Sequence, residues 1–180
     1  VRARRDIGLT VSETADAEAW WDTVEAPPEA LWVALGPGSN MPAKQWPVER
    51  YIDALDAPIH GRQCHPLVLG GESDRTLGEA IVAALGRGRV LAGEVSVRAC
   101  AARLGRCAFY LGNDTGTMHL AAAQGLACAA VFSARDRPGT WYPLGAGHRV
   151  LRAEVECEGC VLETLSLIHI SEPTRQFALA

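Results

Sequence analysis

The stretch AFYLGNDTGTMHLAAAQG, residues 108–125, contains the signals of a strand, a loop and a helix in direct succession. Its first residues, Ala108 to Leu111, form a short apolar run of the kind that predicts a buried strand. Gly116 then opens an alanine-rich helical segment that ends at Gly125. The first N–H groups of a helix have no partners within the helix, and the helix dipole favours negative charge there. The stretch therefore predicts an α/β protein with an anion site where this strand meets its helix.

The polar residues of this stretch fit two interpretations. His119 lies one turn into the helix on the same face as Gly116, where its ring could donate to a phosphate oxygen. In the other interpretation, Asp114 or Thr115 caps an ordinary core helix, and His119 is a polar core residue with a partner. The local sequence leaves both interpretations open.

From residue 30 onward, short apolar runs alternate with segments of helical period. We predict strands at residues 31–35, 66–69, 89–92, 108–111 and 127–132, and a sixth at 148–152. Apolar residues spaced i, i+3, i+4 and i+7 predict helices between them, beginning near Pro47, Ser73 or Asp74, Ser96 and Gly116. Strands that are joined through helices run parallel. The expected fold is therefore a Rossmann-like α/β domain with three layers, α/β/α, around a parallel sheet.

The two ends of the chain differ from this repeating pattern. Residues 1–29 are polar, with a short helix expected within 15–24, and we interpret them as a linker or the remnant of a preceding N-terminal domain. The string LSLIHISEPTR, residues 165–175, matches the translation of an adapter used to prepare DNA sequencing libraries. We exclude residues 165–180 from the fold as a non-native tail. One α/β domain is therefore expected over residues 30–164.

The composition limits the class of protein. The 180 residues carry a net charge of −4 at pH 7, which does not favour nucleic acid or an anionic membrane as the main partner. No apolar run approaches the roughly 20 residues of a membrane span, and we expect a cytoplasmic protein. The six cysteines lie mostly in apolar runs and indicate small buried hydrophobes in a reducing compartment. Cys157 and Cys160 form a lone C-x-x-C without further ligands nearby, so we predict no metal site and no cofactor.

Polar residues gather in the loops after the predicted strands, where ligands bind to parallel sheets. The loop GPGSNMPAKQWP, residues 36–47, carries two short hydrogen-bonding side chains, Ser39 and Asn40. It also carries Lys44, the one lysine beside 16 arginines. A compact ammonium at this edge of the sheet predicts a contact with phosphate. Trp46 is expected to pack the loop against the following helix.

Two further loops have ambiguous side chains. Asp74, at the end of LGGESD, could accept from a ribose hydroxyl or cap the next helix. Asp136 could reach a substrate, but together with Arg135 and Arg137 we interpret it as part of a solvated charge run. No G-x-G-x-x-G follows the first strand, which argues against a dinucleotide cofactor.

Four strings carry a resemblance to a known family: GSNMPAKQWPVERY, LGGESD, LAGEVSVRACAARLGRCAFYLGNDTGTMHLAAAQG and FSARDRPGTWYPLG. In their order and spacing they resemble glycosyltransferase family 9, the ADP-heptose:lipopolysaccharide heptosyltransferases and their relatives, over residues 30–160. The most specific element is D-T-G-x-x-H, from Asp114 to His119, in register with K-x-W-P, from Lys44 to Pro47.

The resemblance implies the C-terminal, donor-binding domain of a two-domain GT-B fold, so residues 30–164 would bind a nucleotide sugar. It places the donor's diphosphate on the D-T-G helix and near the lysine. The residues that it implies at the donor site are Ser39, Asn40, Lys44, Asp74, Asp114, Thr115, Gly116, Thr117, Met118 and His119. The chain departs from family members that have threonines at the positions of Ser39 and Asn40.

The implied reaction is an inverting, metal-independent transfer from ADP-heptose to a lipopolysaccharide core precursor at the inner face of the inner membrane. Lys44 would stabilise the departing diphosphate. The general base, an aspartate, would belong to the N-terminal half, which would also make any peripheral membrane contact. This part alone should bind donor weakly and catalyse little. Three alternatives stay open: a GT-B enzyme that uses a UDP-sugar, a non-catalytic nucleotide-binding module, and a zinc or redox protein built on Cys157 and Cys160.

Overall fold

The computed structural model of the chain describes residues 7–155 and 158–161. Cys157 and the adapter-like string lie outside the described residues. The strands are β1 (Leu31–Gly36), β2 (Cys64–Val68), β3 (Arg89–Val90), β4 (Phe109–Asn113), β5 (Cys128–Val131) and β6 (Arg149–Leu151). The α-helices are α1 (Val11–Asp22), α2 (Val48–Asp56), α3 (Arg75–Leu85), α4 (Val97–Arg103) and α5 (Gly116–Ala123). Single 3₁₀ turns occur at Pro42–Lys44, Glu72–Asp74 and Leu104–Arg106.

The six strands form one parallel sheet in the order β3-β2-β1-β4-β5-β6. This order confirms the predicted parallel α/β architecture. From β1 to β3 the chain moves outward in one direction, and from β4 to β6 it moves outward in the other. The order therefore reverses between β1 and β4, and ligands of such sheets bind outside the carboxyl ends of the strands at this reversal.

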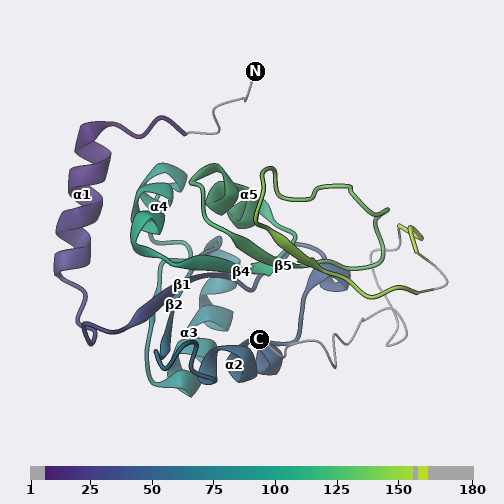
Figure 1. The fold of residues 1–180 in the computed structure, drawn as a ribbon, viewed down its shortest axis with the longest axis horizontal. Coiled ribbons are helices and arrows are strands. Elements are labelled where there is room, and N and C mark those ends of the chain that lie inside the picture. The colour runs from purple at the N-terminus through teal and green to yellow at the C-terminus, as the bar shows by residue number, and fades with distance from the viewer. Residues whose placement is uncertain (1–6, 156–157, 162–180) are drawn as a thin grey trace.

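The helices cover both faces of the sheet, as the three-layer prediction requires. Helices α2 and α3 lie on one face, and α1, α4 and α5 lie on the other (Figure 1). Alternate residues of each strand face opposite layers: Val33 packs in the cluster of Tyr51 and Ile81, whereas Ala34 packs in the cluster of Met118. The sheet is thus buried on both sides, and its carboxyl edge stays available for the loops.

Two predicted boundaries shift for identifiable reasons. Strand β4 continues past Leu111 to Asn113, because Asn113 still pairs with Val131 of β5. Helix α1 begins at Val11 and not near residue 15, since Thr10 and Glu13 form a capping box. The Thr10 hydroxyl accepts from the Glu13 N–H at 3.2 Å, and the Glu13 carboxylate accepts from the Thr10 N–H at 2.7 Å. The T-x-x-E signature was present in the sequence.

Helix α1 packs onto α4, so the described part of the predicted linker belongs to the same packed unit. Trp21 is buried, and its indole Nε1 donates to the Arg103 carbonyl at 3.0 Å. At the other end of α1, the Arg98 guanidinium binds the Glu13 carboxylate and donates to the Gly8 carbonyl at 3.0 Å. These contacts hold the segment that precedes α1 against the first turn of α4.

The Glu13–Arg98 pair predicts an acid-sensitive contribution to stability. Hydrogen bonds from Arg98, and then from the Thr10 backbone, lower the pKa of Glu13 from 4.5 to about 2. Because the folded pKa is depressed, the stabilisation is complete above pH 4.5 and is lost as the pH falls toward 2. The stability difference between the wild type and Glu13→Gln should therefore shrink over this window in urea unfolding experiments. Glu79→Gln, an exposed site without an ion pair among the described residues, should show no such convergence.

Candidate functional site

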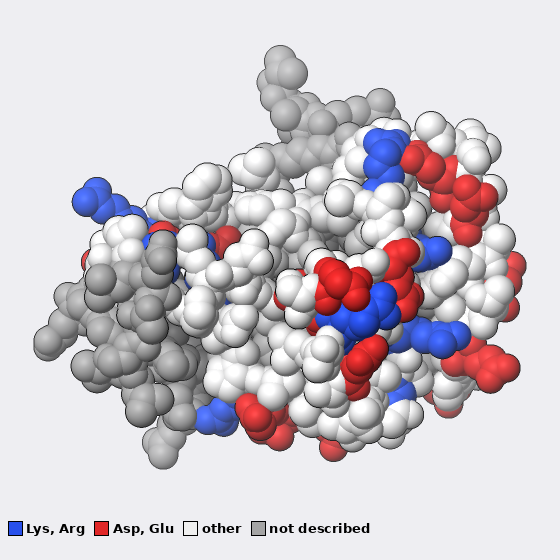
Figure 2. All heavy atoms as spheres, turned by 180° about the vertical axis from the view of Figure 1, so that it is seen from behind, with Lys and Arg blue, Asp and Glu red and all other residues white. Residues whose placement is uncertain are grey.

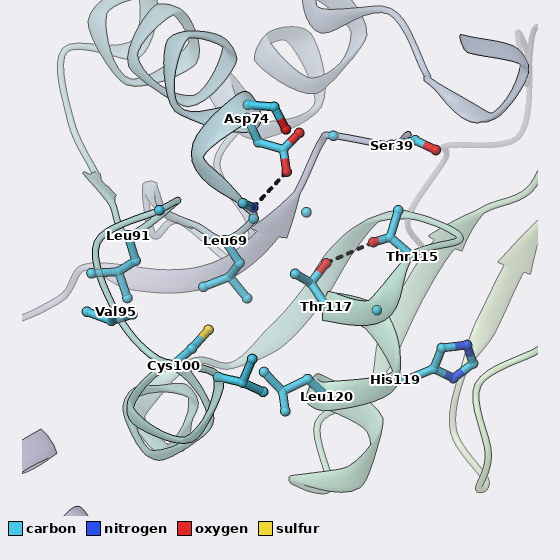
Figure 3. A pocket seen from close by; sticks show the side chains of 18 of the residues that line it. Ser39, Leu69, Asp74, Leu91, Val95, Cys100, Thr115, Thr117, His119 and Leu120 are labelled. Atoms are coloured by element: carbon cyan, nitrogen blue, oxygen red, sulfur yellow. Dashed lines mark hydrogen bonds between the residues drawn. The ribbon is translucent and has the colours of Figure 1, made fainter. Parts of the chain in front are cut away.

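A cavity of about 830 Å³ lies at the carboxyl edge of the sheet, beside the reversal between β1 and β4. The loops after β1, β2 and β3 and the first turns of α5 form its walls (Figure 3). One end is polar and is lined by Ser39, Asp74, Thr115 and Thr117. The other end is apolar and is lined by Leu69, Leu91, Val95, Cys100 and Leu120. Such a division suits a ligand with a charged part and an apolar, ring-like part.

The side chain of Asp74 lies at the polar end of the cavity, closely surrounded by the backbone of neighbouring glycines. Its carboxylate accepts from the Gly71 N–H at 2.9 Å. A Cβ atom at Gly38 would lie 2.0 Å from Asp74 Oδ1, and one at Gly70 would lie 2.4 Å from Oδ2. Only glycine at these two positions leaves room for the carboxylate. Asp74 precedes α3, but its side chain makes no capping hydrogen bond to that helix.

The N-terminus of α5 faces the same end of the cavity. Thr115 is the N-cap residue, yet its side chain makes no capping hydrogen bond. Its hydroxyl lies 2.9 Å from that of Thr117. Among the described residues, the N–H groups of Gly116 and Thr117 make no hydrogen bond. Unpaired N–H groups at the positive end of a helix, next to two hydroxyls, form a suitable site for an anion.

Lys44 lies beside this helix terminus in a cluster of alternating charges. Its Nζ is 2.6 Å from Asp114 Oδ2 and 3.0 Å from Asp136 Oδ2. Asp136 Oδ1 in turn accepts from Arg135 at 3.1 Å. The side chains of Lys44, Asp114 and Asp136 are only 12%, 5% and 15% exposed, so water screens these pairs weakly. Burial opposes the charge on Lys44, but the hydrogen bonds to Asp114 and Asp136 outweigh it and raise the lysine pKa.

The placement of Asp136 corrects the interpretation of residues 135–137 as a solvated charge run. Asp136 is an ion-pair partner of Lys44, and Arg135 is buried. Arg152, the residue after β6, holds this loop by donating to the carbonyls of Ser133 at 3.1 Å and Ala134 at 3.2 Å. The carboxylate of Asp136 is therefore presented to Lys44 by an anchored loop.

Asn113 connects the loop that carries Lys44 to the end of β4. Its side chain is fully buried. The amide oxygen accepts from the Tyr51 hydroxyl at 2.7 Å and from the Trp46 N–H at 3.1 Å. The amide nitrogen donates to the Pro37 carbonyl at 2.6 Å. Burial raises the pKa of the Tyr51 phenol, so this hydroxyl stays protonated and donates. One side chain thus fixes both ends of the 36–47 loop.

The sequence profile of glycosyltransferase family 9 (heptosyltransferase) matches residues 6–170. The chain belongs to glycosyltransferase family 9. None of the curated protein sequences compared with it gives a significant match.

Solved structures of the family share the fold of this family 9 chain. The E. coli ADP-heptose lps heptosyltransferase II is 24% identical, with a TM-score of 0.70 over 86% of this chain and 46% of its own. A family 9 glycosyltransferase from Veillonella parvula DSM 2008 is 21% identical, with the same TM-score over 87% and 46%. The E. coli heptosyltransferase WaaC with ADP is 23% identical, with a TM-score of 0.58 over 78% and 43%. The chain thus spans less than half the length of these proteins and has the fold of half of a GT-B heptosyltransferase.

Most of the site residues that the family resemblance implied come together. The cavity is lined by Ser39, Asn40, Asp74, Thr115, Gly116, Thr117 and His119. Lys44 and Asp114 are not among the residues that line the cavity, but they pair with each other, and Asp114 directly precedes Thr115. Met118 does not line the cavity either, since its side chain is fully buried in the core. Figure 3 shows the ring of His119 directed away from Leu120, toward the opposite side of α5.

Sequence reasoning missed Asn113 and the role of Asp136 in this family 9 domain. The contacts of Asn113 reach 62 to 76 residues along the chain, and those of Asp136 reach Lys44 in a loop after a different strand. An asparagine directly before D-T-G was the available signal for the first. The acidic residue in the loop after the fifth strand was the signal for the second.

The surface and the helices add three observations. On the face seen from behind, basic and acidic side chains lie next to one another and form no large field of one sign (Figure 2). Within residues 7–155 and 158–161, no helix is both long and apolar enough to cross a membrane. In the same residues, no three His, Cys, Asp or Glu side chains are grouped so that they could hold a metal ion.

Proposed function

We propose that this chain is the C-terminal, donor-binding half of a heptosyltransferase-like enzyme, and that it binds the nucleoside diphosphate of an ADP-sugar. The observation that carries the proposal is the α5 N-terminus in the cavity wall, with two threonine hydroxyls and with Lys44 paired to Asp114 just before the helix. The structure of the relative WaaC with ADP, and the naming of heptosyltransferase II for ADP-heptose, support the choice of nucleotide.

In this proposal each part of the nucleotide lies against cavity residues of matching chemistry. The diphosphate lies at the α5 N-terminus, where Gly116 and Thr117 offer N–H groups and Thr115 offers a hydroxyl. The ribose lies near Asp74, whose carboxylate accepts from a hydroxyl. The base lies at the apolar end, between Leu91 and Leu120.

The proposed reaction is inverting and metal-independent. An acceptor hydroxyl attacks the anomeric carbon as the bond from that carbon to the diphosphate oxygen breaks, and a general base supplied by the other half takes the proton. The departing diphosphate gains negative charge, which Lys44 and the α5 N-terminus stabilise. Before the donor arrives, Asp114 and Asp136 balance the ammonium and hold it beside this helix end. A diphosphate therefore meets a cation that is already in place.

We propose further that the acceptor is a lipopolysaccharide core precursor and that the reaction takes place in the cytoplasm at the inner membrane. The naming of the relative heptosyltransferase II for lps supports this acceptor class. We propose the division of the chain into residues 1–29, 30–164 and 165–180 on the sequence pattern described above.

Calorimetry with nucleotides tests the proposed site. We expect ADP to bind more tightly than AMP, because the second phosphate reaches the α5 N-terminus and Lys44, and more tightly than UDP. Gly38→Ala should weaken ADP binding roughly 10-fold, since the added methyl group would displace the Asp74 carboxylate. Gly105→Ala is the matched control, because its Cβ would meet no atom within 4 Å. Tighter binding of UDP would favour a UDP-sugar enzyme, and no binding of any of the three nucleotides would contradict the proposal.

A further inference from the structure

A chain of three hydroxyls connects the interior of the sheet to the wall of the cavity. Tyr110 of β4 is fully buried, and its Oη lies 3.0 Å from Thr117 Oγ1. Thr117 Oγ1 lies 2.9 Å from Thr115 Oγ1, the contact drawn in Figure 3. Both threonines line the cavity, whereas Tyr110 does not. Tyr110 therefore contacts the cavity wall indirectly, through the hydroxyl of Thr117.

Two glycines make the space that the Tyr110 hydroxyl occupies. Gly36 of β1 and Gly112 of β4 are partners in the parallel register. A Cβ atom at Gly36 would lie 2.1 Å from Tyr110 Oη and 2.4 Å from Thr117 Oγ1, and one at Gly112 would lie 2.4 Å from Tyr110 Oη. Any larger residue at either position would push the phenol or the threonine out of the chain of hydroxyls. Four residues from β1, β4 and α5 thus combine to form one contact.

The direction of these hydrogen bonds follows from the chemistry of the two ends. A phosphate oxygen only accepts hydrogen bonds, so a threonine that contacts it must give its single proton to the ligand. That threonine can then only accept from its neighbour. At the buried end, burial raises the pKa of the Tyr110 phenol, so the phenol keeps its proton and donates. The competing acceptor for this proton, the Asn113 carbonyl, is farther away at 3.4 Å.

We propose that Tyr110 is a positioning residue for the donor diphosphate: it donates to Thr117, so that Thr117 donates to Thr115 and Thr115 gives its proton to a phosphate oxygen. This inference rests on the proposed function, because it concerns the phosphate end of the same site. It assigns a ligand-directed role to a residue that does not reach the ligand. It also explains why a tyrosine and two facing glycines occur together at this point of the sheet.

The test compares ADP with adenosine, because adenosine lacks the group that the hydroxyl chain serves. Tyr110→Phe keeps the ring and removes the first donor, so we expect ADP to bind roughly 3- to 10-fold more weakly in calorimetry, with unchanged binding of adenosine. Thr117→Val should weaken ADP binding at least as much, and Thr117→Ser, which restores the hydroxyl, should recover most of the affinity. Adding Tyr110→Phe to Thr117→Val should cause no further loss, because the phenol acts only through Thr117.

Trp21→Phe provides the control for a general loss of stability. It also keeps a buried aromatic ring and removes one hydrogen bond, from Nε1 to the Arg103 carbonyl, at the far end of α1. ADP binding should be the same in this variant as in the wild type. Wild-type ADP affinity in Tyr110→Phe, or equal losses for ADP and adenosine, would overturn the inference while leaving the proposed function intact. A Tyr110→Phe chain that did not fold would also overturn it, since the hydroxyl would then serve the fold. Failure of the wild type to bind ADP would instead remove the proposed function.

Discussion

Lys44→Met should lower both the stability of the domain and its affinity for ADP, and we expect these to be the largest effects of any single change at the site. Methionine keeps most of the side-chain length but removes the charge. The buried carboxylate of Asp114 and the partly buried one of Asp136 would then remain without the ammonium, while Asp136 would keep its pair with Arg135. Leaving one partner of a buried ion pair uncompensated costs on the order of 3 kcal/mol. Urea unfolding followed by circular dichroism would measure this loss.

The expected loss of ADP binding in Lys44→Met has a separate electrostatic cause. The variant removes an attractive charge and leaves two negative ones beside the place proposed for the diphosphate. A charge-assisted contact contributes roughly 2–3 kcal/mol, so affinity should fall on the order of 100-fold in calorimetry. Asp114→Asn added to Lys44→Met should recover part of the stability, because the carboxylate that lost its ion-pair partner is gone, without restoring ADP binding.

Arg106→Met is the control for the loss of a cation. Arg106 pairs with Glu18 and Asp22 on the exposed side of α1, away from the cavity. Exposed pairs contribute little, so stability should change by less than about 1 kcal/mol, with no change in ADP affinity. ADP binding that is the same in Lys44→Met as in the wild type would show that Lys44 does not contact the diphosphate.

Asn113→Ala should cause the second large loss, mainly of folding stability. The substitution removes the acceptor of the Tyr51 hydroxyl and of the Trp46 N–H, and the donor to the Pro37 carbonyl. Each buried polar group that is left without a partner costs roughly 1–3 kcal/mol. We therefore expect the free energy of unfolding to fall by at least about 3 kcal/mol, a large part of the roughly 5–15 kcal/mol that is typical of a domain. ADP affinity should also fall, because the loop that carries Ser39 and Lys44 would lose its attachment to β4.

Two comparisons test whether the stability loss of Asn113→Ala comes from its hydrogen-bond network and not simply from removal of a carboxamide group. Asn113→Ala leaves the Tyr51 hydroxyl without its acceptor, and adding Tyr51→Phe removes this hydroxyl. The stability loss of the double variant should therefore be smaller than the sum of the losses of the two single variants. Gln124→Ala removes another carboxamide, one whose buried Nε2 has no partner among the described residues, and should change stability little. Equal losses for Asn113→Ala and Gln124→Ala in urea unfolding would contradict the proposed network.

The elements of this fold could be predicted from the sequence because their signals are local. The apolar run that leads into Gly112 and the stripe of Val48, Tyr51 and Leu55 identify a strand and a helix from a few neighbouring residues. Alternation of such segments requires a parallel sheet, and the carboxyl-edge loops then follow from the topology. For this reason, seven of the residues that the family resemblance implied at the donor site do line a single cavity at that edge.

The partners of the polar side chains were decided by the tertiary structure alone. Lys44 and Asp136 belong to loops after β1 and β5, and their pairing depends on the strand order, on the register and on the anchoring of residues 133–136 by Arg152. Helix α5 is short and apolar on several sides, so the sequence did not reveal that Met118 faces the core. Periodicity reports which residues tend to be buried, whereas ion pairs and hydrogen bonds depend on atoms that only the packed layers bring within about 3 Å. The sequence by itself therefore determined the architecture and the region of the site, and the packing decided which charges and hydroxyls act together in it.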